Sequence, residues 1–166
     1  MSSHRHEVLR YRGRDYLLLV DPLSSCRDHR VRRRMAALGM RPEVSWPEHY
    51  AGWAVSRSRL WLVKLQTNEH VLAPDGVHVV GWGEVSPDLL FPGTSGPVLA
   101  DWYNGELVAG IGDGARVAQY GRDWQKYRVF SIERGSVTKI EVRDNSKKYR
   151  EGLANYERFS RMLDGL

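Results

Sequence analysis

This chain of 166 residues is poor in cysteine, and its longest aliphatic run near the N-terminus spans only Leu17–Val20. Its single cysteine, Cys26, excludes an internal disulfide and any zinc site built from several cysteines. A membrane-spanning helix needs ~20 consecutive apolar residues, and no stretch approaches that length. The first fourteen residues carry charge but no apolar segment, so no secretory signal peptide is expected. We therefore predict a cytoplasmic protein.

Aromatic residues, by contrast, are plentiful. Six tryptophans and eight tyrosines supply the bulk for a folded core and argue against disorder. A chain of this length typically forms one domain, and the sequence shows no internal repeat, low-complexity tract or linker. The prediction is a single α+β domain over residues 1–166, with no cofactor assigned.

Turn signals divide much of the chain into β-hairpins. Two-residue turns are expected at Arg12-Gly13, Arg57-Ser58, Asn104-Gly105 and Arg134-Gly135. Asn-Gly tolerates the positive φ angles of a type I′ turn, which makes Asn104-Gly105 the clearest of these signals. Four hairpins favour a single twisted antiparallel sheet of about six to eight strands, in which Trp53 faces Trp61 across its turn. Between Gln66 and Gly96, prolines and glycines predict loops around one short strand at Val77–Val80.

Two helices are predicted from the spacing of apolar residues. A C-terminal helix from Lys147 to Leu163 is expected to pack on the sheet. Its apolar positions are Tyr149, Leu153, Tyr156, Phe159, Met162 and Leu163. A second, arginine-rich helix is expected from about Ser25 to Leu38, with Val31 and Met35 on its apolar stripe and Gly39 at its end.

Charge is distributed unevenly along the chain. Residues 1–43 and 114–166 each carry a net charge of +5, whereas residues 44–113 carry −5. The densest basic run consists of Arg27, Arg30, Arg32, Arg33, Arg34 and Arg41. Arginine binds phosphates bidentately, so one alternative is an RNA- or DNA-binding accessory protein that uses this basic face. No aromatic residue interleaves with the arginines, which favours the other interpretation, a solvated face of an amphipathic helix.

The acidic middle third predicts a different surface. We expect its carboxylates to lie near exposed aromatic side chains and to bind a basic protein partner. The residues assigned to this acidic face are Asp88, Asp101, Trp102, Tyr103, Glu106 and Asp113. The competing interpretation is that these carboxylates are dispersed over loops and paired with arginines of the flanking thirds.

No group of residues has the spacing of a catalytic or metal-binding motif. Gly110–Ala115 resembles a glycine-rich phosphate loop, but its third glycine comes one residue early for G-x-G-x-x-G and no lysine follows. Cys26, Asp28 and His29 lie close together in the sequence, but this does not indicate a catalytic site, because catalytic partners usually converge in space from distant parts of the chain. His4 and His6 lie at a chain terminus, which is a poor place for a preorganised metal site. A hydrolase or transferase with a site at Asp101-Trp102 is retained as a third alternative.

Three segments resemble a family of small uncharacterised bacterial proteins. Tyr11–Tyr16 with Asp21–Leu23 is similar to the family's opening x-Y-x-G-x-x-Y strand pair and x-P-L turn. Trp46–Val55 with Arg59–Leu62 is similar to the family's W-R-G-Y-x-G-T-W-x-I and G-x-L-Y-L segments. Leu99–Leu107 is similar to its F-A-D-W-[FY]-[ST]-G-x-L segment. The departures are Pro47, Glu48 and His49, which stand where the family has Arg, Gly and Tyr. The resemblance implies a compact β-rich domain and a bacterial source, and it brings no catalytic residue.

These observations together lead to a functional hypothesis. A stable fold without a credible catalytic set, and with strong local charge asymmetry, favours a small bacterial protein-binding module rather than an enzyme. Such a module is expected to act as an accessory protein or as an immunity protein that neutralises a toxin encoded nearby.

Overall fold

The computed structural model of the chain describes residues 7–40, 49–73, 76–116 and 122–165. Strands dominate these residues, alongside two α-helices and two short 3-10 helices (η). In chain order the elements are β1 (Val8–Tyr11), β2 (Arg14–Leu18), η1 (Leu23–Ser25), α1 (His29–Ala37), β3 (His49–Ser56), β4 (Arg59–Ala73), β5 (Gly76–Val85), η2 (Pro87–Leu89), β6 (Val98–Leu99), β7 (Gly105–Ile111), β8 (Ala115–Arg116), β9 (Arg122–Asp123), β10 (Lys126–Glu133), β11 (Ser136–Asp144) and α2 (Ser146–Asp164). The predicted mixture of strands with a C-terminal helix is confirmed.

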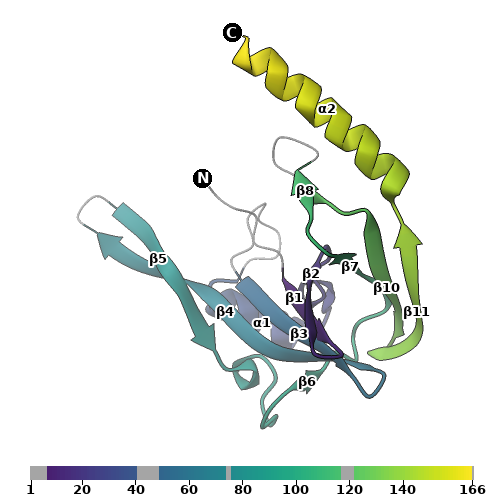
Figure 1. Cartoon of the computed structure of the whole chain (residues 1–166). Coiled ribbons are helices and arrows are strands. Elements are labelled where there is room, and N and C mark those ends of the chain that lie inside the picture. Colours follow the sequence, from purple (N-terminus) through teal and green to yellow (C-terminus); the bar gives the residue numbers. More distant parts are fainter. Residues whose placement is uncertain (1–6, 41–48, 74–75, 117–121, 166) are drawn as a thin grey trace.

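The main sheet closes on itself, which corrects the prediction of an open antiparallel sheet (Figure 1). Seven strands form a barrel in the order β11-β10-β7-β2-β1-β3-β4, and Ser136 of β11 pairs with Arg59 of β4 to complete the ring. Neighbouring strands are antiparallel except β1 and β3, which are parallel. Both features join segments that are distant in the sequence, so local turn signals carry no information about them.

Three of the four predicted turns are confirmed. They connect β1 to β2, β3 to β4, and β10 to β11 at the expected residue pairs. Both central residues of each turn have positive φ, from 47° at Arg134 to 78° at Gly135. Paired positive φ angles define a type I′ turn, whose twist matches that of the flanking strands.

The prediction of a hairpin turn at Asn104-Gly105 is wrong, although Asn-Gly is the clearest of the four turn signals. Gly105 begins β7, while the preceding strand β6 pairs with β4 instead of β7. The chain reverses earlier, where the Tyr103 amide donates to the Ala100 carbonyl at 3.0 Å. Asn104 caps another turn instead, because its Oδ1 accepts the backbone amide of Arg134 at 2.8 Å.

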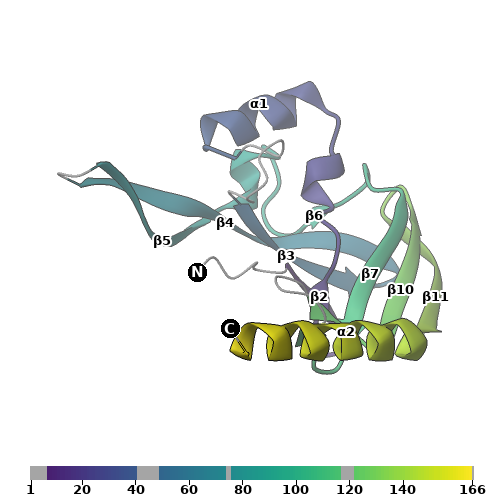
Figure 2. The same ribbon diagram turned by 90° about the horizontal axis from the view of Figure 1, so that it is seen from above.

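The region predicted as loops contains the longest strand described. β4 continues to Ala73 and pairs with β5 to form a hairpin. The predicted strand at Val77–Val80 lies within β5, but the loops predicted before it and directly after it are wrong. Figures 1 and 2 show this hairpin extending away from the barrel. Glycine-rich β5 pairs through its backbone, for which side-chain propensity is a poor guide.

Both predicted helices form, and each differs from its prediction in one respect. α1 starts at His29, four residues later than expected, because the Asp28 side chain caps it by accepting the amide of Arg30 at 2.8 Å. Gly39, with φ of 78°, follows the helix as predicted. α2 matches its expected bounds within a residue, but it packs on the sheet less than predicted, since none of its described residues is buried and Tyr149, Leu153 and Tyr156 are only half-buried.

The barrel interior is apolar and includes Leu9, Trp53, Leu62 and Phe130. Trp53 pairs with Leu62, whereas Trp61 pairs with Ala54, so the expected Trp53–Trp61 pair is wrong. The two-residue turn at Arg57-Ser58 sets this register, and because side chains alternate along a strand, the two rings lie on opposite faces.

Candidate partner-binding surface

The C-terminal helix is the element with the most exposed apolar side chains. Phe159, Met162 and Leu163 are 42%, 67% and 52% exposed. Their i, i+3, i+4 spacing puts them on one side of α2 at its distal end. Figure 1 shows α2 running from the end of β11 past β8, with its C-terminus at the end distant from the barrel. The sequence identified these side chains but assigned them to the core.

The start of α2 is fixed to the barrel by polar contacts. The Asn145 amide nitrogen of the side chain donates to the carbonyl of Trp124 at 3.0 Å and to the carboxylate of Asp123 at 3.1 Å. The Asp144 carboxylate accepts the backbone amide of Ser146 at 2.7 Å. Hydrogen bonds from the side chain and then the backbone of Ser146 lower the pKa of that carboxyl. Trp124 is itself buried beside Tyr127. The helix therefore has a rigid base and an uncovered tip.

Charge on α2 is mostly positive. Its charged residues are Lys147, Lys148, Arg150, Glu151, Glu157, Arg158, Arg161 and Asp164. Arg161 and Glu157 are 3.8 Å apart, in an exposed pair that contributes little to stability. The surplus of two positive charges lies at the base of the helix, in Lys147, Lys148 and Arg150 against Glu151, whereas the basic and acidic side chains around the exposed apolar tip balance.

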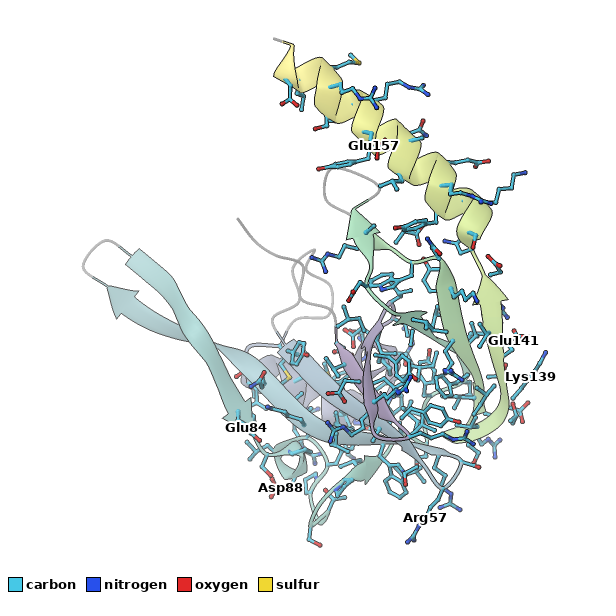
Figure 3. All side chains as sticks on the ribbon, viewed as in Figure 1. Arg57, Glu84, Asp88, Lys139, Glu141 and Glu157 are labelled. Atoms are coloured by element: carbon cyan, nitrogen blue, oxygen red, sulfur yellow. The ribbon has the colours of Figure 1, made fainter. Side chains whose placement is uncertain are left out.

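The four carboxylates of the predicted acidic face lie on different parts of the molecule. Asp88 is in η2, on the opposite flank from β11 in Figure 3. Glu106 and Asp113 flank opposite ends of β7, and Asp101 is exposed in the turn after β6. The Glu106 carboxylate also accepts hydrogen bonds from both terminal nitrogens of Arg143, at 2.7 and 2.8 Å, and these bonds lower the pKa of Glu106. The placement matches the competing interpretation of dispersed carboxylates more closely.

The two aromatic residues of that face have structural contacts. Trp102 is partly exposed, stacks on Phe91 with ring centroids 5.0 Å apart, and donates its indole N–H to the carbonyl of Pro22 at 2.9 Å. Tyr103 is buried, and its hydroxyl donates to the carbonyl of Glu106 at 2.8 Å. Burial raises the Tyr103 pKa. The expectation that Tyr103 is exposed is therefore wrong.

The predicted basic face is divided between structural and exposed arginines. Arg32 donates to the carbonyls of Cys26 and Ser24, and Arg34 donates to the carbonyl of Leu90. These bonds hold α1 against η1 and η2. The remaining described members of the set, Arg27, Arg30 and Arg33, are exposed, and Arg41 lies outside the described residues.

Two buried groups have shifted pKa values. Burial raises the pKa of the Cys26 thiol, which makes it a weak nucleophile at neutral pH. Burial, reinforced by the charge of Asp21, raises the pKa of Glu7. The Glu7 carboxylate accepts the indole N–H of Trp53 at 2.8 Å and the amide of Ala51 at 3.2 Å, so it joins β1 to β3.

The described residues contain no metal-binding cluster and no membrane-spanning helix. No group of three or more His, Cys, Asp and Glu side chains there is placed to hold a metal ion. Neither described helix combines the length and apolar character needed to cross a membrane. His4 and His6 lie outside the described residues. No family model, curated protein or solved structure matches the chain.

Proposed function

We propose that this protein is a protein-binding module that docks the tip of α2 into an apolar groove of its partner. The observation that carries the proposal is the exposure of Phe159, Met162 and Leu163 on one side of a helix with an anchored base. An amphipathic helix laid into a hydrophobic groove is a recurring mode of protein recognition, with anchor residues at i, i+3 and i+4.

The net charge of the chain favours a particular kind of partner. The whole chain carries a net charge of +5, so two copies repel each other and a second copy of the chain is a poor occupant. A groove with an acidic rim would gain from the same charges. An accessory or immunity protein whose acidic target is encoded nearby fits this description.

A double variant and a single control variant test the proposal. Phe159→Glu with Leu163→Glu puts acidic side chains into the docking face. Ala154→Glu introduces an acidic side chain on the opposite side of the helix. Ala154 and Leu163 are nine residues apart, which at 100° per residue places them on opposite sides of the helix. All three positions are exposed, so the variants should fold like the wild type.

The assay compares proteins captured by each full-length variant in the source cells and then measures affinity for the purified partner. We expect one acidic protein that binds the wild type and Ala154→Glu equally. The double variant should bind it at least about 30-fold more weakly, because ~2 kcal/mol or more of apolar burial is lost. Equal affinity of all three proteins, self-association, or binding to anionic vesicles instead of a protein would refute the proposal.

A further inference from the structure

The barrel wall is incomplete along β11 beyond its single pairing with β4. Register places Ile140 and Val142 of β11 opposite Phe130 and Arg128 of β10, on the interior face. Phe130 is fully buried, yet Ile140 and Val142 are 40% and 51% exposed. In the described sheet β11 pairs with β4 at Ser136 and continues from there without that partner. Interior-facing side chains beyond this point therefore contact solvent.

Arg128 lies in this part of the barrel, close to two aromatic rings. Its guanidinium carbon is 5.7 Å from the ring centroid of Tyr11 and 5.7 Å from that of Tyr16. Cation–π contacts of this kind hold a guanidinium in place without using its N–H donors. The Nε–H of Arg128 is buried and has no hydrogen-bond partner in the described part of the chain.

The positive charge at the opening is not neutralised by the described residues. Among the ion pairs formed within them, none involves Arg128, Arg12 or Arg14. Arg12 lies 5.3 Å from the Tyr11 ring, and Arg14 is paired with Tyr11 across the hairpin. A buried donor on a charged group without a partner is uncommon in folded proteins and calls for an explanation.

We propose that this opening, formed by Tyr11, Tyr16, Arg128, Ile140 and Val142, binds a small amphipathic oxyanion. A carboxylate or phosphate head group accepts the Nε–H and a terminal N–H of Arg128 side by side, as guanidinium forks permit. The exposed side chains of Ile140 and Val142 contact the apolar body of the ligand. The site is separate from the tip of α2 and does not depend on the proposed function.

The test follows the Arg128 Nε–H resonance by NMR during titration with octanoate, octyl phosphate, inorganic phosphate and octanol. We expect a saturable downfield shift with octanoate or octyl phosphate, and the stronger of the two identifies the head group. Inorganic phosphate and octanol should each bind at least about tenfold more weakly, because each lacks one half of the ligand. Equal affinity for inorganic phosphate would refute the apolar part of the site.

Three variants make the assignment specific. Arg128→Gln should weaken binding of the preferred ligand at least about tenfold, and Arg57→Gln, at an exposed turn, should leave it unchanged. Should Arg128→Gln not fold, Val142→Glu replaces a half-exposed residue and puts an internal carboxylate opposite Arg128. We expect this variant to shift the Nε–H resonance by itself and to block the ligand. An unmoved resonance with every probe, or unchanged binding by Val142→Glu, would overturn the proposal.

Discussion

Gly110→Ala tests how the base of α2 is held. A Cβ at position 110 would lie 2.5 Å from the Cδ2 and Cε2 atoms of Trp124, well inside the ~3.5–4.0 Å of a normal carbon contact. Trp124 is 1% exposed and donates its indole N–H to the carbonyl of Gly112 at 3.2 Å. The ring must therefore move by about 1 Å or more, which strains the packing and weakens that hydrogen bond.

The expected cost follows from these two effects. Overpacking a well-filled site costs ~1–3 kcal/mol, and a hydrogen bond contributes ~1 kcal/mol, so Gly110→Ala should destabilise the protein by about 2–4 kcal/mol. For a chain of this size the melting temperature should fall by roughly 5–15 °C. Calorimetry or thermal denaturation followed by circular dichroism measures this change.

A control and a double variant separate the steric effect from other causes. Gly13→Ala meets no atom within 4 Å and measures only the cost of a positive φ angle of 74°, about 1–2 kcal/mol. Replacing Trp124 with Leu should remove most of the additional cost of Gly110→Ala, which gives a coupling energy of ~1–3 kcal/mol. A loss no larger than that of Gly13→Ala, or additive effects in the double variant, would show that the ring does not pack on Gly110.

Further predictions concern charged groups. Because burial raises the pKa of Glu7, the native state binds more protons than the unfolded state above the ordinary glutamate pKa, so the free energy of unfolding should fall with rising pH by up to ~1.4 kcal/mol per unit. Urea titrations from about pH 5 to about pH 7 should show this slope in the wild type, and Glu7→Gln should flatten it; a parallel slope would contradict the assignment. Asp28→Ala removes the cap of α1 and should lower the melting temperature by about 2–4 °C, and Asp28→Asn should restore most of it, whereas a loss in both would point to another role. Arg143→Gln breaks exposed pairs with Glu106 and should change the melting temperature by less than about 2 °C, so a large loss would show that the pairs are structural.

Sequence reasoning succeeded where the determinant of structure is local. The Arg12-Gly13 and Arg134-Gly135 turns are two-residue reversals between adjacent strands, and both residues of each pair tolerate or favour positive φ. The bounds of α2 follow in the same way from the helical spacing of its apolar residues. These features depend on a few neighbouring residues, so they can be read without knowledge of the rest of the chain.

Sequence reasoning failed where tertiary contacts determine the outcome. Asn104-Gly105 is a favourable hairpin sequence, but β6 finds its partner in β4, and the Asn104 side chain binds the amide of Arg134. The closure of the barrel depends on a pairing between Ser136 and Arg59, which no local pattern encodes.

The candidate surfaces show the same division. The apolar positions of α2 were identified, but spacing alone does not tell whether a stripe faces a core or a partner. Arg128 was missed because its significance comes from Tyr11 and Tyr16, which are more than 100 residues away in the sequence.

A photo-crosslinking scan along the distal half of α2 tests the central claim, that this protein binds a partner through the tip of its C-terminal helix. A photoreactive residue is placed singly at each exposed position from Ala154 to Leu163 of the full chain, and crosslinked protein is measured in the source cells. The account predicts yields that rise and fall with the 3.6-residue period of a helix, highest at Phe159, Met162 and Leu163 and lowest at Ala154, all to one partner. A flat profile, or a maximum on the side of Ala154, would contradict it.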